Sequence, residues 1–333
     1  MQIRVLNQQD MKEVFTMEEA VKAAGDALAM YSAGKTDIPL RANINVAEHG
    51  GNSLYMYGYA APAEALGVKI VSVYSGNAVK GLPVVPATMV LLNSATGQVC
   101  SLMDGTYLTR ARTGAAAGAA TKLLAREDSR VFALIGTGGQ AEGQLEAVLT
   151  VRPGLEKVKV YSRNFEKADA FAKAMSEKFA AKFGVEIIAV HSSEKAVADA
   201  DIITVVTTSK EAVLDGRLLK KGVHINAMGS YTPDMADVDE YTVLHADKIY
   251  TDTNEGVLSE SGDVIQPMEK GLFKESDITG ELGQAINGGV ACRESDDELT
   301  LFESVGTAVL DIVTAQRIYE RAEAMNIGTV IEL

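Results

Sequence analysis

The sequence predicts an α/β protein that combines a doubly wound parallel sheet with a separate β-rich domain. Between residues 129 and 250, apolar β-type runs alternate with helical patterns, which is the spacing of a parallel sheet with crossover helices. A glycine-rich turn stands between the first of these strands and its helix. Between residues 38 and 105, by contrast, β-type runs follow one another without helices, which is not the pattern of βαβ units.

Composition limits the classes of function. A chain of 333 residues with 47% hydrophobic and 23% charged residues is typical of a globular protein with two domains or one large one. The net charge of −14 argues against nucleic acid or an anionic membrane as the main partner. No run approaches the ~20 apolar residues of a membrane span, and no signal-peptide core is evident, so we expect a cytoplasmic protein. Two cysteines and four scattered histidines predict no metal site.

The N-terminal part begins with a strand over residues 3–6 and a helix that ends at Gly34. Thr16 and Glu19 have the spacing of a capping box for this helix. Five β-type runs follow: residues 41–46, 53–57, 67–73, 88–92 and 99–103. A helix over residues 108–126 comes next, and its small residues between 114 and 120 favour close packing against another helix or a cofactor.

The glycine turn is the strongest local signal. The apolar strand 131–135 leads directly into Gly136-Thr-Gly138-Gly-Gln, and a helix starts at Gln140. Gly136 permits a tight turn, Gly138 permits close approach of a pyrophosphate, and Ala141 permits close packing of helix and strand. The free N–H groups of a helix N-terminus also favour phosphate. The segment therefore predicts a Rossmann-type domain that binds a nicotinamide dinucleotide.

The end of the second strand indicates which nicotinamide nucleotide is used. Residues 157–161 form the predicted strand, and an acidic residue after it would accept hydrogen bonds from the ribose of NAD. Here Ser162 and Arg163 follow, with Lys167 one turn later. A small polar residue with basic neighbours suits a 2′-phosphate, so NADP(H) is favoured and NAD(H) remains possible. The alternative is that Arg163 is an ordinary exposed residue.

Further strands are predicted over residues 185–190, 202–207 and 222–227, with helices over 165–179 and 193–200. Residues 251–303 look irregular. A closing helix over residues 304–325 has an apolar stripe that is expected to pack on the N-terminal part: Val305, Val309, Ile312, Ala315 and Ile318. The predicted domains are residues 1–115 with 305–333, for substrate binding and dimerisation, and residues 116–304, for NAD(P) binding.

Three basic residues outside the nucleotide-binding domain, Arg41, Lys69 and Arg112, have apolar or small neighbours. We call them the basic triad. Lys69 is the most informative, because it interrupts an apolar strand and an unpaired buried charge is costly. Arginine forks suit a carboxylate, and a desolvated lysine can exchange a proton near neutral pH. Each residue alone also fits a salt-bridged or snorkelling side chain.

Several motifs together resemble the ornithine cyclodeaminase/mu-crystallin family. They span nearly the whole chain and lie at residues 81–86, 94–97, 103–116, 135–141, 226–230, 279–283 and 300–306. The resemblance implies a homodimer formed by the β-rich domains, a Rossmann domain that carries NAD(P), and a substrate held between the two domains. It also implies that the basic triad grips the substrate carboxylate and that Lys69 is the catalytic residue, which exchanges a proton with the substrate nitrogen.

The same resemblance implies the residues that contact the cofactor. The pyrophosphate turn corresponds to Gly136, Gly138, Gly139 and Gln140, and the ribose position to Ser162 and Arg163, where the chain is more similar to the NADPH-using mu-crystallins. The residues expected to line the nicotinamide and its ribose are Thr207, Met228, Ser230 and Ser304, and Thr113 is added to the cofactor-binding set.

One departure from the family pattern affects the expected reaction. Ornithine cyclodeaminases carry an aspartate where this chain has Tyr231, and an acid in the stretch before Lys69, where residues 49–63 of this chain contain none; Asp234 is a less favoured substitute. A carboxylate would take a proton from the substrate's terminal ammonium, and a tyrosine would not. The leading hypothesis is therefore an NAD(P)-dependent oxidoreductase of amino or imino acids, such as a Δ1-pyrroline- or Δ1-piperideine-2-carboxylate reductase or an amino-acid dehydrogenase. The alternatives are ornithine cyclodeaminase itself and a non-catalytic ligand-binding protein of the mu-crystallin kind.

Overall fold

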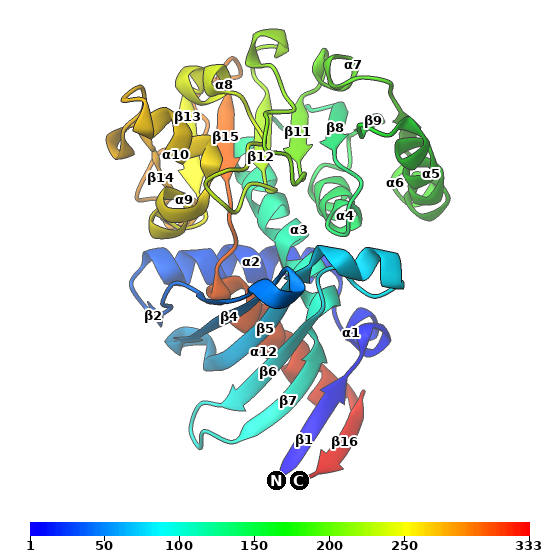
Figure 1. Cartoon of the computed structure of the whole chain (residues 1–333), viewed down its shortest axis with the longest axis vertical. Helices are drawn as coiled ribbons and strands as arrows, with labels where there is room; N and C mark the ends of the chain where they lie inside the picture. Colours follow the sequence, from blue (N-terminus) through cyan, green and yellow to red (C-terminus); the bar gives the residue numbers. More distant parts are fainter. The chain divides into compact units, whose positions relative to one another are not determined.

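The computed structural model describes residues 1–333, apart from the side chain of Ala78. The chain divides into two compact units (Figure 1). The terminal unit comprises residues 1–112 and 307–333, and the central unit comprises residues 113–306. The chain leaves the terminal unit within helix α3 (Gly105–Leu124) and returns to it after strand β15 (Thr300–Glu303). Among the described residues, no helix has the length and apolar character needed to cross a membrane.

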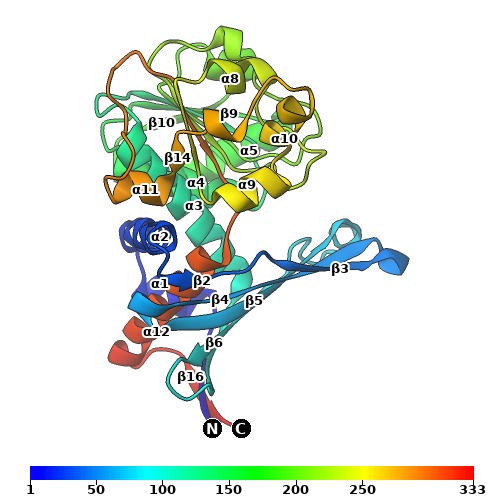
Figure 2. The same cartoon turned by 90° about the vertical axis from the view of Figure 1, so that its left-hand side faces the viewer.

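The terminal unit is built on a mixed sheet with the strand order β16-β1-β7-β6-β5-β4-β2, and β3 pairs with β4. Its neighbours are antiparallel except β1 and β7. Figure 2 shows β3 and the adjoining parts of β4 and β5 extending as an arm from the rest of this sheet. The strands are β1 (Gln2–Leu6), β2 (Thr36–Asp37), β3 (Ala42–Val46), β4 (Gly51–Ala60), β5 (Ala65–Tyr74), β6 (Ala87–Asn93), β7 (Val99–Asp104) and β16 (Thr329–Glu332).

Three helices belong wholly to the terminal unit: α1 (Gln8–Val14), α2 (Met17–Ser32) and α12 (Ala308–Met325). The capping box predicted for α2 is confirmed, because Thr16 and Glu19 each bond the other's backbone N–H. Helix α12 packs on β4, β5 and β6. Alternate residues of β5 are buried on the side that meets α12, whereas Ile70, on the opposite face, is exposed. The terminal sheet is thus covered by α12 on one face.

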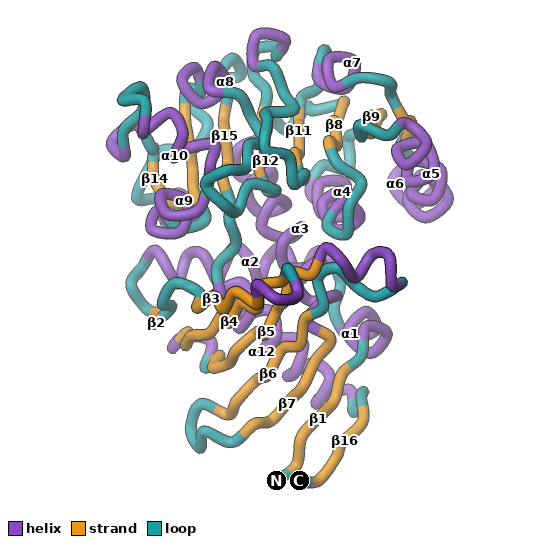
Figure 3. The backbone as a smooth tube through the Cα atoms, in the orientation of Figure 1, coloured by secondary structure: helices purple, strands orange, loops and turns teal.

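The central unit contains eight parallel strands in the order β10-β9-β8-β11-β12-β15-β13-β14, with helices around them (Figure 3). The direction of winding reverses between β8 and β11, so the predicted doubly wound parallel sheet is confirmed. Its other strands are β8 (Val131–Ile135), β9 (Lys157–Tyr161), β10 (Glu186–Ala189), β11 (Ile202–Val205), β12 (His224–Ala227), β13 (Lys248–Thr251) and β14 (Gly280–Glu281). Its helices after α3 are α4 (Ala141–Val151), α5 (Phe165–Met175), α6 (Ala181–Phe183), α7 (Ser193–Val197), α8 (Glu240–His245), α9 (Asn254–Glu260), α10 (Gly262–Glu269) and α11 (Leu282–Ile286).

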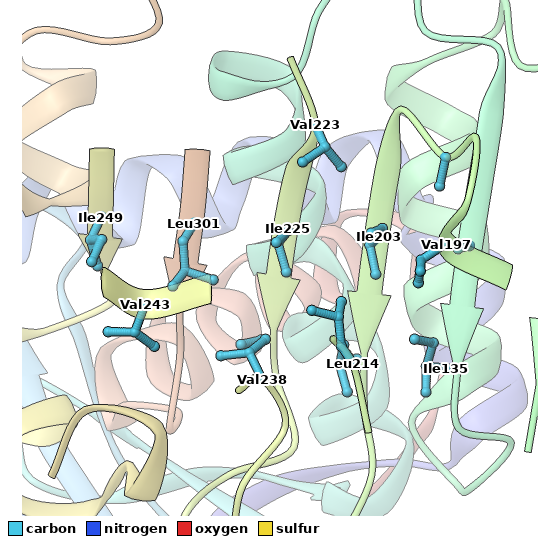
Figure 4. Packing of buried hydrophobic residues seen from close by; sticks show 14 of the residues in the cluster. Ile135, Val197, Ile203, Leu214, Val223, Ile225, Val238, Val243, Ile249 and Leu301 are labelled. Carbon is cyan, nitrogen blue, oxygen red and sulfur yellow. The ribbon is translucent and has the colours of Figure 1, made fainter. Parts of the chain in front are cut away.

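Both faces of the central sheet are buried, as expected for parallel strands. In β8, Ile135 belongs to one core cluster and its neighbour Leu134 to a second. Figure 4 shows the first cluster, in which Ile203, Ile225 and Leu301 project from successive strands to the same side. This continuous burial fixes the carboxyl ends of β8, β11 and β12, which carry the loops considered below.

Two sequence-based expectations were wrong. Residues 251–303 contain α9, α10, β14, α11 and β15; these helices have five to eight residues, too few to show a helical period, and several start at local caps such as that of Thr253. The closing helix begins at Ala308 instead of Ser304. Asp252 accepts hydrogen bonds from Ser304 Oγ and the Gly306 N–H, which holds this stretch in a turn, and Val305 packs in the core of the central unit.

Candidate active site

Lys69 lies in the middle of β5 and is completely buried. Its cross-strand neighbours are Met56 on β4 and Met89 on β6, both buried, so the strands themselves offer the ammonium no polar partner. The partner comes from α12, where Asp311 Oδ1 accepts a hydrogen bond from Lys69 Nζ at 2.8 Å. The lysine in this apolar strand is therefore paired with a carboxylate from a helix that is distant in the sequence.

Arg112, on α3, uses the same oxygen. Its Nε donates to Asp311 Oδ1 at 2.8 Å, so one carboxylate oxygen serves two cations. Asp311 is fully buried, and its second oxygen, Oδ2, has no hydrogen-bond partner among the described residues. Likewise, no hydrogen bond from the Nη nitrogens of Arg112 is found in the part of the chain that the structure describes. Asp311 thus holds two cations in place, while its Oδ2 and the Nη nitrogens of Arg112 have no hydrogen bond among the described residues.

The electrostatic setting makes Lys69 a group that can exchange a proton near neutrality. Burial, reinforced by the charge of Arg112, lowers the pKa of Lys69 to about 7, while Asp311 acts in the opposite direction. Arg41, half-buried just before β3, contributes to the same lowering of the pKa, which places its charge near the Lys69 ammonium. The structure therefore joins Lys69 and Arg112 on Asp311 as their shared counterion, with Arg41 close enough to affect the pKa of Lys69.

An anion is the ligand that this group suits. Protonated Lys69 and Arg112 together carry two positive charges against the single negative charge of Asp311, which both contact. Arginine nitrogens arranged as a fork can bind a carboxylate through two hydrogen bonds. A neighbouring lysine with a pKa near 7 can then give a proton to, or accept one from, an atom of the bound molecule.

The glycine turn in the central unit has the features that a dinucleotide requires. Gly136 has a φ of +108°, and a Cβ there would lie 2.6 Å from the Val206 carbonyl oxygen at the end of β11, so only glycine fits. At Gly138 and Gly139 a Cβ would meet nothing within 4 Å, which leaves the backbone open to an approaching group. Helix α4 begins directly afterwards, with Gln140 at its N-cap and the Gln140 Oε1 buried without a partner.

The ribose position lies at the end of β9. Ser162 is half-buried and Arg163 is exposed, and Asn164 caps α5 by accepting a hydrogen bond from the Lys167 N–H. No carboxylate follows β9 in the sequence before Glu166. The residues present therefore fit an adenine nucleotide with or without a 2′-phosphate, and Arg163 is free of any described hydrogen bond that would compete for its guanidinium.

The residues expected to line the nicotinamide are held in place by buried aspartates. Asp237 Oδ1 accepts a hydrogen bond from Thr207 Oγ1 at 3.1 Å, and its Oδ2 accepts bonds from the backbone N–H groups of Gly229 and Ser230. Asp252 plays the same part for Ser304, whose Oγ donates to Asp252 Oδ2 at 2.7 Å. Met228 is buried at the end of β12. These loops are therefore held by hydrogen bonds to Asp237 and Asp252, two carboxylates that the sequence analysis did not single out.

Thr113 is buried, and the next residue explains its setting. A Cβ on Gly114 would lie 2.3 Å from the Gly143 carbonyl oxygen of α4. The small residues of α3 thus allow close contact with another helix, which confirms the first of the two explanations given for them. Thr113 is thereby placed beside the helix that follows the glycine turn.

Three buried carboxyl groups form a second unusual feature of the central unit, which we call the carboxyl cluster: Asp237, Asp263 and Glu303. Burial raises the pKa of Asp237 to about 7, and burial together with the neighbouring carboxylates raises the pKa of Asp263 and of Glu303 well above the usual range. Asp263 Oδ2 and Glu303 Oε1 have no hydrogen-bond partner among the described residues. Burial and like charge therefore favour the protonated forms of these carboxyl groups.

Asp311 is the main residue that sequence reasoning missed. A signal was present, because Asp311 lies on the same helical face as Ala315 and Ile318, which the apolar stripe places toward the core. A carboxylate on a buried face requires a cation, and Lys69 was already known to require an anion. Lys69 and Asp311 lie 242 residues apart in the sequence, and they come into contact only in the folded chain.

The structure also describes the residues at which the sequence departs from the cyclodeaminase pattern. Tyr231 is half-buried and packs against the core of the central unit. Asp234 is exposed and pairs with Lys210 at 2.8 Å, and this contact lowers the pKa of the Asp234 carboxyl. A carboxylate of lowered pKa is a weaker base, so Asp234 is a poor substitute for a catalytic aspartate.

Comparisons with known proteins bear on the family, the fold and the class of reaction. A model of the ornithine cyclodeaminase/mu-crystallin family matches residues 1–326. A Δ1-pyrroline-2-carboxylate reductase from Bacillus cereus is 40% identical over 328 residues, covering 98% of this chain and 99% of the relative. The structure of Thermococcus litoralis Δ1-pyrroline-2-carboxylate reductase with NADH and L-proline is 42% identical, with a TM-score of 0.93 over 98% of this chain and 99% of that one. An archaeal alanine dehydrogenase dimer with bound NAD is 32% identical, with a TM-score of 0.90 over the full length of both chains.

Proposed function

Because this chain belongs to the ornithine cyclodeaminase/mu-crystallin family, we propose that it is an NAD(P)-dependent reductase of cyclic 2-imino acids, with Δ1-pyrroline-2-carboxylate as the foremost candidate substrate. The observation that carries the proposal is the pairing of Lys69 and Arg112 on Asp311, which joins a carboxylate-binding fork to a lysine that titrates near pH 7. A cyclic imino acid presents both groups that this arrangement serves, a carboxylate and a basic nitrogen on the adjacent carbon.

The chain's own residues have separate tasks in this reaction. Arg41 and Arg112 bind the substrate carboxylate and thereby fix the orientation of the ring. Lys69, in its protonated form, donates a proton to the imine nitrogen. Asp311 holds Lys69 and Arg112 in fixed positions relative to each other. The nicotinamide, when bound, supplies the hydride to the substrate α-carbon. The same residues working in the opposite sense would dehydrogenate an amino acid.

The cofactor is assigned to the central unit. The open turn at Gly138 and Gly139 in front of α4 supports the pyrophosphate, and Thr207, Ser230 and Ser304 are proposed to surround the nicotinamide ribose. We assign NADP(H) as the preferred form, because Arg163 is exposed where a 2′-phosphate would lie and no acid occupies that place. The NADH in the Thermococcus litoralis structure makes NAD(H) the competing choice.

A homodimer is part of the proposal. The face of the terminal sheet opposite α12 exposes large apolar side chains, including Tyr57 and Ile70, and the arm exposes Ile44, which is 53% accessible. Exposed apolar residues gathered on one sheet mark an interface, and the similar archaeal alanine dehydrogenase is a dimer. Sedimentation equilibrium of the purified chain, with Ile44→Lys as the variant, tests this: a monomeric wild type would end the proposal.

The function is tested by following the oxidation of NADPH and NADH with Δ1-pyrroline-2-carboxylate and Δ1-piperideine-2-carboxylate, with L-ornithine assayed in parallel for ammonia. Oxidation of either nucleotide with formation of the cyclic amino acid supports the reductase. Release of ammonia and proline from ornithine without net change in the nucleotide would identify an ornithine cyclodeaminase instead. That outcome would mean that a group other than Asp234 accepts the proton of the substrate's terminal ammonium, because Asp234 is paired with Lys210.

A further inference from the structure

The contact between Asp311 and two members of the basic triad, Lys69 and Arg112, uses an unusual distribution of hydrogen bonds. Asp311 Oδ1 alone receives Lys69 Nζ and Arg112 Nε, each at 2.8 Å. A carboxylate that served only to neutralise an arginine would be expected to face the fork with both oxygens. Among the contacts of the described residues, only Nε of Arg112 is engaged, so both terminal nitrogens remain for another carboxylate. Holding Arg112 by Nε fixes the plane of the guanidinium and leaves its outer edge for the substrate.

Among the described residues, Asp311 is the only carboxylate that pairs with Lys69 or with Arg112. The strands against which α12 packs contribute Met56 and Met89 beside Lys69, and neither ionises. The charged residues farther along α12 are engaged elsewhere: Arg317 pairs with Asp26 of α2 at 2.6 Å, and Arg321 pairs with Glu19. The charged groups that face Asp311 are therefore Lys69, Arg112 and, through its effect on Lys69, Arg41.

We propose that Asp311 is a positioning residue for the reaction: by holding Lys69 and Arg112 on one oxygen, it aims the arginine fork at the substrate carboxylate and keeps a proton on the lysine for the substrate nitrogen. This inference rests on the function proposed above. Arg112 and Arg41 both repel the proton of Lys69, and the Asp311 carboxylate offsets them. Without that carboxylate, two buried cations would face each other, and the lysine, as the one that can lose its proton, would become neutral.

Two variants separate charge from geometry. In Asp311→Asn the shape is kept and the charge is lost, so the pKa of Lys69 should fall by about 1–3 pH units. In Asp311→Glu the charge is kept but displaced by one methylene group, so the KM for the imino acid should rise about 10- to 100-fold while the pKa changes little. Asp26→Asn, the same substitution at another carboxylate that contacts α12, is the matched control and should change neither quantity.

The titration of Lys69 is measured by NMR on protein carrying [13Cε]lysine, with the Lys69→Arg variant used to identify the resonance. This readout needs no substrate. In parallel, kcat/KM for imino-acid reduction is measured against pH; the alkaline side of the profile, where the donor proton is lost, should move to lower pH in Asp311→Asn. An enzyme that merely lost packing would lose activity equally at all pH values.

The outcomes are distinguishable. An unchanged Lys69 midpoint in Asp311→Asn overturns the inference, as does an unchanged KM in Asp311→Glu. If Asp311→Asn does not fold, the KM of Asp311→Glu decides the positioning role by itself. If the wild type reduces no imino acid, the proposed function fails, and a lowered Lys69 midpoint in Asp311→Asn still shows that Asp311 controls the lysine.

Discussion

The two units of this protein bury charge in opposite ways. In the terminal unit, Lys69 and Arg112 are buried with a single counterion, Asp311, which touches both. In the central unit, Asp237, Asp263 and Glu303 are buried without any cation, and their oxygens are met by backbone N–H groups and hydroxyls such as Ser261 Oγ. The groups of the first arrangement remain charged, whereas the carboxyl groups of the second remain protonated.

The difference follows from what each group must do. The pKa values of the carboxyl cluster rise because burial penalises the charged form and the neighbours are like-charged, so the cluster can become neutral and serve as a hydrogen-bonded brace for loops. The arginines of the triad cannot become neutral, so charge stays in the terminal unit and is available for an anionic ligand. We infer that ionic chemistry belongs to the terminal unit and that the carboxyl cluster supports structure.

The largest effect expected from breaking this contrast is at Lys69. Lys69→Met should lower kcat for imino-acid reduction by about 10²–10⁴-fold, because the proposed proton donor is lost. Methionine suits the site, since Met56 and Met89 flank it, and Asp311 keeps Arg112 as a partner. Steady-state kinetics on folded protein checks this. Lys157→Met, at a strand lysine with a surface ion pair to Glu186, is the control and should keep its activity. Full activity in Lys69→Met would remove the lysine from the mechanism.

A carboxyl-to-amide exchange compares the two units directly by their stability. Asp311→Asn removes the carboxylate that Lys69 and Arg112 share, which leaves the Arg112 charge buried without its counterion, and should lower the free energy of unfolding by about 3–5 kcal/mol. Glu303→Gln removes a group that must stay protonated and should raise it by about 1–3 kcal/mol at alkaline pH. The measurement is urea unfolding of both variants across a range of pH. Changes of the same sign in both variants would contradict the contrast between the units.

The sign of the pH dependence also differs between the units. Asp237 has a folded-state pKa of about 7 against an ordinary value of 3.8, so its contribution to stability is complete below pH 3.8 and is lost as the pH rises toward 7. Glu303 acts in the same direction, which is why Glu303→Gln gains most at alkaline pH. Lys69 has a lowered pKa, so the folded state binds fewer protons than the unfolded chain between about pH 7 and 10.5, and its contribution rises with pH in that range.

The smallest of these effects concerns the cofactor and tests whether the units divide their tasks. Arg163→Ala should raise the KM for NADPH by about tenfold, through loss of a charged contact to the 2′-phosphate, and should leave the KM for NADH and for the imino acid unchanged. Initial rates with each nucleotide provide the measurement. Arg217→Ala, at another exposed arginine of the central unit, is the control. Equal effects on both nucleotides would show that Arg163 does not read the phosphate.

Much of the fold was predictable because its signals are local. The strand at residues 131–135, the turn at Gly136 and the capping box of Thr16 and Glu19 each lie within a few residues, and all three are confirmed. The short helices between residues 251 and 286 escaped prediction because one or two turns carry too little periodicity. The start of α12 was misplaced because the turn at Ser304 is held by Asp252, which lies on another strand end.

The residues of the candidate site also differ in whether a local signal in the sequence predicts them. Lys69 could be singled out because a lysine in an apolar strand is conspicuous by itself, whereas Asp311 and Asp237 act through partners that are distant in the sequence. Residue patterns report which side chain needs a partner; they do not report which one it finds. The reverse reasoning, from a buried carboxylate on a helix face to the lysine that requires it, needs the two elements in contact.

The pairing of Lys69 with Asp311 across 242 residues has a consequence for biosynthesis. A ribosome delivers β5 early and α12 only after the whole central unit has emerged, so the central unit can fold while the terminal sheet still lacks the helix that covers it. During that interval the nascent β5 carries an uncompensated lysine, which opposes burial of the strand. We expect that α12, on its arrival, covers the sheet and pairs the lysine in one step, so that the contact between Lys69 and Asp311 forms last.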